Sequence, residues 1–142
     1  MSTEENRIIV RRFFKELLTA GNVSVADEIL EPDFVFHGAT ATLTGLEDLK
    51  RTLIALHGSF SAQDYAIEDE CVEGDKLVTR WTWRGTHQRE YLGIAPTGKQ
   101  VTAWGITLFY IAHGRIAESW EMWNALGLLK QLGATALPTV GS

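Results

Sequence analysis

Apolar residues in the first twenty positions recur every three or four residues, which is the spacing of one face of a helix. Ser2 followed by Glu5 forms a capping-box pattern before this stripe, and Gly21 is the residue type that commonly ends a helix. At 3.6 residues per turn, the pattern predicts a helix of about five turns. Its apolar stripe consists of Ile8, Ile9, Val10, Phe13, Phe14, Leu17 and Leu18.

Two shorter helices are predicted before residue 60. One begins at Ser24, with Asp27 three positions later, and ends before Pro32, because proline interrupts helical hydrogen bonds. The other begins at a second capping box, Thr44 and Glu47, and runs to about residue 58. Its apolar positions at helical spacing are Leu46, Leu49, Leu53 and Leu56.

From residue 64 the spacing changes to alternating runs rich in β-branched and aromatic residues, which predict strands. Short turns join these runs, so we expect neighbouring strands to be antiparallel. The predicted strands are residues 65–72, 77–87, 100–112 and 116–123, with an additional edge strand FVFHG at 34–38 and a closing helical turn at 125–133.

These elements predict an α+β domain in which three N-terminal helices pack on one face of a curved sheet, antiparallel or mixed. A strongly bent sheet over helices leaves a cone-shaped cavity, which is a favoured place for small molecules. We expect residues 1–142 to form one domain, with an ordered core over about 3–134 and a flexible tail at 135–142.

The net charge of -5 and the sequence pI of about 5.3 argue against nucleic acid as a partner. The chain has no apolar run of membrane-spanning length, and its first residues do not resemble a signal peptide, so we expect a cytoplasmic protein with no membrane partner. The single cysteine, Cys71, is expected to be a buried free thiol. Zinc-site spacings and nucleotide-binding loops are missing from the sequence, so we predict neither a metal nor a cofactor.

Alternation in the run 77–87 defines two sides of a strand but does not say which of them faces the helices. A side of mixed polarity is typical of an outer face that joins a second subunit, and equally of a polar-lined pocket. The two are compatible, and we predict a homodimer through the outer face of the sheet and a small-molecule site under the inner face. The two sides are Leu77, Thr79, Trp81 and Trp83, against Val78, Arg80, Thr82 and Arg84.

The run GRIAESWEMWN, residues 114–124, holds a carboxylate, Glu121, between Trp120 and Trp123. Glu121 is either a solvated charge on an outward face or a carboxylate inside a pocket. Alternation puts Glu121 on the face of Ser119 and Trp123, and we expect Trp104 as a further neighbour. Indole walls would strip water from the carboxylate and raise its pKa toward a value useful for proton transfer.

Three segments carry a family signature: FVFH after EPD at 34–37, GTHQREYLGIAPTGKQVT at 85–102, and HGRIAESWEMWNALGLLKQLGA at 113–134. Together they resemble the SnoaL-like polyketide cyclase or ester cyclase family. That family belongs to the nuclear transport factor two-like superfamily, so the resemblance implies the cone-shaped fold shared with ketosteroid isomerase. The fold hosts cyclases, isomerases, hydrolases, hydroxylase-like enzymes and non-catalytic proteins, so the fold alone does not define the reaction.

The resemblance implies that Glu121 is the acid/base residue, where the archetypal cyclase has aspartate. The family's histidine falls on Thr107 here, and its polyketide-contacting asparagine falls on Phe36, whereas histidine is kept at His87 and at His37. Thr107 either bonds a ligand oxygen or simply suits a strand, and the two histidines either line the pocket or bond backbone near strand ends. With Glu121 as the catalytic residue, the predicted substrate-binding residues are His37, Phe36, Trp104, Thr107, Trp123, Phe14 and His87.

We therefore predict a cofactor-independent acid/base enzyme that acts on a polyketide-like or other carbonyl-bearing small molecule, by aldol-type cyclisation or a related isomerisation. The missing histidine and asparagine favour an alternative, a hydrolase or hydroxylase-like member of the same fold. A further alternative is a non-catalytic dimeric module that binds an apolar ligand. A polar, clustered pocket with Glu121 near His37 or Thr107 would support an enzyme, whereas a wholly apolar cavity, or Glu121 in solvent, would favour the binding module.

Overall fold

The computed structural model describes residues 3–134. Its first helix changes from α-helical to π-helical winding part-way along. α1 (Thr3–Arg12) is α-helical, and residues Phe13–Thr19 continue it as a π-helix. The predicted helix of about five turns is confirmed in its extent. Its expected cap, Ser2, lies outside the described residues, as does the tail at 135–142 that we expect to be flexible.

The predicted second helix is shorter than expected, and the strand after it occupies an unexpected place. A single 3₁₀ turn (Val23–Val25) leads into α2 (Ala26–Ile29), and β1 (Leu30–His37) begins before the proline. β1 lies between β2 (Thr42–Thr44) and β6, and it runs parallel to β6. The prediction of an edge strand at 34–38 is therefore wrong, because β2 covers the outer side of β1.

The third helix is confirmed, but its predicted cap is wrong. α3 spans Leu46–Ser59 and is preceded by Gly45, which has a φ of +83° that favours glycine. Thr44 is paired with Val35 as the last residue of β2, and the residue at the helix N-cap makes no side-chain capping bond. The strand pairing of Thr44 therefore takes the place of the capping box.

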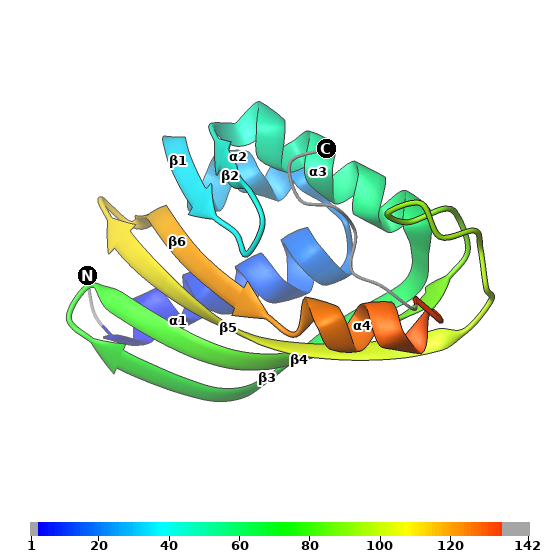
Figure 1. Ribbon diagram of the computed structural model, residues 1–142. Helices are drawn as coiled ribbons and strands as arrows, with labels where there is room; N and C mark the ends of the chain where they lie inside the picture. Colours follow the sequence, from blue (N-terminus) through cyan, green and yellow to red (C-terminus); the bar gives the residue numbers. More distant parts are fainter. Residues whose placement is uncertain (1–2, 135–142) are drawn as a thin grey trace.

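The predicted meander is confirmed and forms most of a six-stranded sheet of order β2-β1-β6-β5-β4-β3. Its long strands are β3 (Phe60–Glu73), β4 (Lys76–His87), β5 (Gln100–Ala112) and β6 (Arg115–Trp123). All pairings are antiparallel except that of β1 with β6, so the sheet is mixed. Figure 1 shows the sheet curving from β3 up to β1 and β2 around α1, with α3 on the side opposite the long strands and α4 (Ala125–Gln131) at the end of β6.

The side of β4 that faces the helices is the one with Leu77, Thr79, Trp81 and Trp83, all of which are buried. This settles the question that alternation left open, because only this side packs against the aromatic residues of the first helix. Phe13 packs edge-on against Phe109 of β5, with ring centroids 5.2 Å apart. The opposite, outer face leaves large apolar side chains exposed: Val78, Trp104, Ile106, Trp120 and Met122.

Cys71 is exposed, so the expectation of a buried thiol is wrong. It pairs with Val78 of β4, whose side chain is also exposed on the outer face. Among residues 3–134, helices long and apolar enough to cross a membrane are absent.

Candidate active site

A cavity of about 440 Å³ lies between the inner face of the sheet and α3. The segment between β1 and β2 closes one part of its wall, and Tyr91 of the loop between β4 and β5 closes another. Most of the wall is apolar, with residues such as Phe13, Phe36, Leu53, Trp83, Trp123 and Leu128. A cavity of this volume and character is typical of a site for a small organic molecule.

Glu121 lines this cavity, so the carboxylate in the run 114–124 faces inward rather than into bulk solvent. Alternation along β6 explains the placement, because Ser119 is buried while Trp120 and Met122 are exposed on the other face. Burial raises the pKa of Glu121 to about 7, and a hydrogen bond from Thr107 acts in the opposite direction. A carboxyl group with such a pKa can take up and release a proton near neutral pH.

Thr107 holds the carboxylate of Glu121 through a hydrogen bond of defined direction. The two residues are directly opposite each other on β5 and β6, and Oγ1 of Thr107 donates to Oε1 of Glu121 at 3.1 Å. Nε1 of Trp81 donates to the same Oγ1 at 2.9 Å. Because an indole N–H only donates, Thr107 accepts from Trp81 and is left with its single proton for Glu121.

Gly105 makes room for this arrangement in the middle of β5. It pairs with Trp81 on one side and with Trp123 on the other. A Cβ atom at this position would meet the ring of Trp81, and it would lie 2.8 Å from the carbonyl oxygen of Met122 and from Cβ of Trp123. Because glycine has no side chain, it leaves room for the ring of Trp81 to reach Thr107.

Two tyrosines in the cavity wall, Tyr65 and Tyr91, were not predicted from the sequence. Burial is the largest cause of the raised pKa of Tyr65, and the charge of Glu121 is the second. Burial also raises the pKa of Tyr91. Tyr65 and Ile67 are two residues apart on β3 and so share one side of the strand, which is a signal that could have found Tyr65. An irregular register between Ser61 and Asp64 obscures which side of this strand faces inward.

The model of the SnoaL-like polyketide cyclase family matches residues 8–132 of the sequence. The chain belongs to this family. The six-stranded mixed sheet with its helices is the α+β cone fold that the family shares with nuclear transport factor two-like proteins, so both the predicted family and the predicted fold class are confirmed. The family match over residues 8–132 therefore covers nearly all of the described residues, 3–134.

Solved structures of SnoaL-like proteins superpose on nearly the whole chain. A candidate SnoaL-like polyketide cyclase from Jannaschia sp. CCS1 has a TM-score of 0.86 and 26% identity, over 96% of this chain and 98% of the other. TsrD from Streptomyces laurentii has a TM-score of 0.84 and 26% identity, over 94% and 98%. AclR, a candidate hydroxylase from Streptomyces galilaeus, shares the fold with a TM-score of 0.83 at 22% identity, over 93% and 98%. No curated protein matches the sequence of this chain.

Among the residues that the SnoaL-like pattern singles out, Phe36 and Trp123 line the cavity together with Glu121. Thr107 is fully buried behind the carboxylate, where it contacts Glu121 instead of the open space. Phe14 is also buried away from the cavity and packs against Phe109, with ring centroids 5.8 Å apart. The structure therefore brings Phe36, Trp123 and Thr107 to Glu121, and it places Phe14 in the core.

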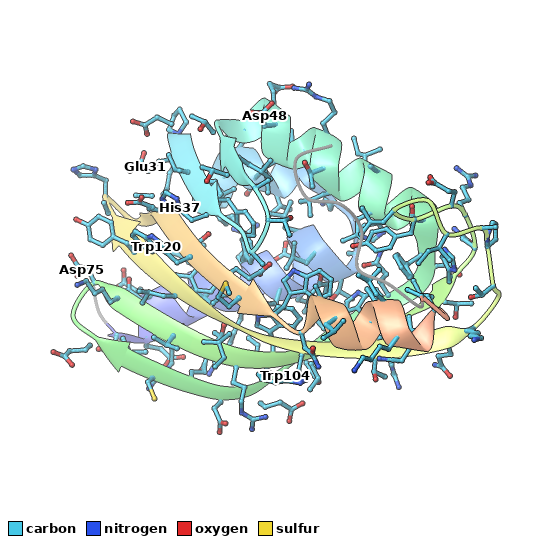
Figure 2. The ribbon with its side chains drawn as sticks, viewed as in Figure 1. Glu31, His37, Asp48, Asp75, Trp104 and Trp120 are labelled. Carbon is cyan, nitrogen blue, oxygen red and sulfur yellow. The ribbon has the colours of Figure 1, made fainter. Side chains whose placement is uncertain are left out.

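His37 and Trp104 lie on the outer face of the sheet, so the expectation that they face the cavity is wrong. The ring of His37 stacks on Trp120 at 5.2 Å, and Nε2 of His37 lies 2.6 Å from Oε2 of Glu118 (Figure 2). Trp104 is 50% exposed and points away from the helices (Figure 2). The reason is the period of two, which puts His37 opposite in direction to Phe36, and Trp104 opposite to its neighbours Ala103 and Gly105.

His87 is fully buried at the end of β4, next to the loop that carries Tyr91. The backbone N–H of Thr97 donates to its Nδ1 at 3.2 Å, so a neutral ring carries its proton on Nε2. That Nε2 is buried without a hydrogen-bond partner among residues 3–134. His87 thus anchors the loop through Thr97, and it does not line the cavity.

Within the described residues 3–134, no three His, Cys, Asp or Glu side chains gather in a way that could hold a metal ion. The side chains that line the cavity offer acid/base chemistry of their own. They supply one carboxylate with a raised pKa, one buried hydroxyl bonded to it, and an apolar wall with two phenols.

Proposed function

We propose that this SnoaL-like protein is an acid/base enzyme in which Glu121 removes a proton from carbon next to a carbonyl group. The observation that carries the proposal is the position of Glu121, whose carboxylate lines an apolar cavity of about 440 Å³. Burial there raises its pKa to about 7, so the group exchanges protons with a substrate near neutral pH.

The proposed reaction is an aldol-type ring closure, in which each proton is accounted for. The carboxylate of Glu121 takes the proton from the α-carbon, and the electron pair of the broken C–H bond delocalises onto the carbonyl oxygen as an enolate. The enolate carbon attacks a second carbonyl carbon of the same molecule, and a C–C bond forms. The resulting alkoxide takes the proton back from Glu121, which returns the enzyme to its starting state.

The proposed substrate is a carbonyl compound with a flat apolar part. The indoles of Trp83 and Trp123 in the cavity wall favour a planar ring, because aromatic groups stack or meet edge to face. The contact between Glu121 and Thr107 supports an enzyme over a simple binding module, because it orients a carboxylate in an otherwise apolar wall. The family and the fold also include proteins described as cyclases and as a hydroxylase, so the reaction is decided by this site and not by the fold.

Exchange of α-protons for deuterium tests the proposal without knowledge of the natural substrate. 2-Tetralone is a flat bicyclic ketone with acidic α-protons, and its exchange in D₂O is followed by NMR. We expect the wild-type protein to accelerate the exchange and Glu121→Gln to lower the rate about a hundredfold or more, the usual share of a general base. The rate should rise with pH and level off above about 7, as Glu121 ionises.

Tyr110→Phe is the matched control, because Tyr110 lies on β5 outside the cavity wall and loses only a hydroxyl. Equal exchange rates in wild type and Glu121→Gln would remove Glu121 from the chemistry. A wild-type protein that binds 2-tetralone without accelerating its exchange would favour the non-catalytic binding module.

A further inference from the structure

Tyr65 is held rigidly in the cavity wall, on the strand farthest from Glu121 in the order of the sheet. Its backbone N–H donates to Oγ1 of Thr19 at 3.1 Å. Its ring packs against Trp81 at 5.4 Å and against Phe14 at 6.0 Å, both measured between ring centroids. A side chain fixed from the helix and from the neighbouring strand points its hydroxyl in one direction, which is a requirement for a preorganised donor.

The hydroxyl of Tyr65 makes no hydrogen bond to any residue in the described part of the chain, 3–134. Tyr65 and Glu121 both line the cavity, and Trp81 connects them, because its ring packs against Tyr65 and its Nε1 donates to the Thr107 hydroxyl that bonds Glu121. Burial raises the pKa of Tyr65, and the negative charge of Glu121 raises it further. Within residues 3–134, Glu121 accepts a hydrogen bond from Thr107 and not from Tyr65, and both Glu121 and Tyr65 line the same cavity. A small molecule in the cavity can therefore contact both groups.

Most other donors in the cavity wall are already engaged. Nε1 of Trp81 donates to Thr107, and Nε1 of Trp83 donates to Oε1 of Gln63 at 2.9 Å. The hydroxyl of Ser59 donates to the carbonyl oxygen of Glu90 at 3.1 Å. These groups serve the protein's own structure, because a buried acceptor that loses its donor is costly.

Tyr91 and Trp123 also line the cavity, but the contacts of Tyr65 distinguish it from them. The ring of Tyr91 packs edge-on against Phe60, whereas that of Tyr65 packs against Trp81, which donates to the Thr107 hydroxyl that bonds Glu121. Trp123 lies two residues after Glu121 on the same strand, so its side chain is a neighbour of the carboxylate and does not face it across the cavity.

We propose that Tyr65 is a second catalytic residue, which donates a hydrogen bond to the carbonyl oxygen that becomes the enolate when Glu121 removes the α-proton. This proposal rests on the proposed function. The phenol keeps its proton throughout: the C–H bond breaks toward Glu121, the negative charge develops on the substrate oxygen, and the O–H of Tyr65 stabilises it. When the enolate attacks the second carbonyl, the charge leaves the first oxygen and this hydrogen bond weakens again.

Binding of a phenolate tests Tyr65 without any turnover. Ionised 4-nitrophenol is a flat anion with a negatively charged phenolate oxygen conjugated to the ring, so it mimics the enolate, and its absorption of visible light reports its own ionisation. The background is Glu121→Gln, because the neutral amide stands for the protonated carboxyl that follows proton removal. 4-Nitroanisole, which cannot ionise, measures the contribution of apolar contacts alone.

In the Glu121→Gln background, we expect Tyr65→Phe to weaken binding of 4-nitrophenolate about tenfold or more, the usual effect of losing a hydrogen bond to a charged group. Binding of 4-nitroanisole should change less than twofold. The pKa of bound 4-nitrophenol should rise in Tyr65→Phe, because its ionised form loses the donor. Tyr110→Phe, outside the cavity, should change none of these values.

Three results would overturn the proposal: equal losses for both ligands, a loss of phenolate affinity in Tyr91→Phe or Trp123→Phe but not in Tyr65→Phe, or no binding of the phenolate at all. Failure here is distinct from failure of the proposed function. If Glu121→Gln abolishes α-proton exchange while Tyr65→Phe leaves phenolate binding intact, Glu121 keeps its role and Tyr65 loses its own. If phenolate binding depends on Tyr65 but exchange does not depend on Glu121, the proposed base is wrong.

Discussion

Thr107 and Glu121 are directly opposite each other on adjacent strands, and the hydroxyl of Thr107 donates to the carboxylate at 3.1 Å. The donor is itself held by the indole of Trp81, so three side chains on three neighbouring strands form one chain of hydrogen bonds. This bond counteracts part of the pKa rise that burial causes at Glu121. Thr107 stands where the resemblance places the family's histidine, and here it orients the carboxylate without titrating.

Thr107→Val tests this relationship with a side chain of similar shape and no hydroxyl. Loss of the hydrogen bond removes the effect that lowers the pKa of Glu121, so that pKa should rise above about 7. Trp81 loses its acceptor, and unfolding should require about 1–3 kcal/mol less free energy. Carbon-13 NMR of the Glu121 carboxyl group and urea unfolding measure the two effects. Thr107→Ser keeps the hydroxyl and should resemble wild type; the same low stability in both variants would contradict the assignment.

The raised pKa of Glu121 predicts how stability depends on pH. The group's ordinary pKa is 4.5 and its value in the folded protein is about 7, so the folded state holds the proton more tightly between these values. The free energy of unfolding of wild type, relative to Glu121→Gln, should therefore fall as pH rises from about 4.5 through about 7 and then stay constant. The total fall is on the order of 3 kcal/mol. Chemical unfolding of both proteins at about pH 5 and about pH 8 measures it, and a difference that does not change with pH would show that Glu121 is solvated.

Gly105→Ala should damage the site indirectly. The added methyl group meets the ring of Trp81 and the backbone at Met122, so Trp81 has to move away from Thr107. We expect a loss of stability of about 1–3 kcal/mol, as is usual for overpacking, and a reduced rate of α-proton exchange. Gly58→Ala is a control for the substitution itself, because Gly58 lies in α3 and a Cβ atom there would meet Nη1 of Arg89 at an ordinary contact distance of 3.7 Å. A Gly105→Ala protein with unchanged exchange would mean that Trp81 does not support the site.

The exposed apolar side chains of the outer face predict a homodimer through this face. Ile106 and Met122 are paired in register at its centre, and both are exposed, at 44% and 69%. A contiguous patch of this kind on a sheet is typical of a subunit interface. The double variant Ile106→Lys, Met122→Lys should halve the mass in sedimentation equilibrium, from twice to once the 15.8 kDa of the chain. Leu92→Lys, an exposed apolar residue in the loop after β4, should leave the mass unchanged; a wild type that sediments as a monomer would remove the prediction.

Alternation and helical spacing were sufficient to predict most helices and strands, and to predict which residues of β6 share a face with Glu121. The stripe from Ile9 to Leu17 and the runs of β3 to β6 depend only on neighbours in sequence, so they could be predicted without coordinates. Thr44 shows the limit of such local signals. Thr44 and Glu47 have the spacing of a capping box, but in the structure Thr44 pairs with Val35 of the neighbouring strand β1 instead.

The sequence by itself determined the family, the α+β class and the fact that Glu121 shares a face with Trp123. Only the tertiary structure decided which face of the sheet packs on the helices, that β1 runs parallel beside β6, and that His37 turns outward to Glu118. It also decided that Tyr65 and Glu121 line the same cavity, although 56 positions separate them in the sequence. The physical reason is that a period of two separates the sides of a strand but does not identify the inner one. That choice comes from the burial of apolar surface against segments distant in sequence, which no local pattern records.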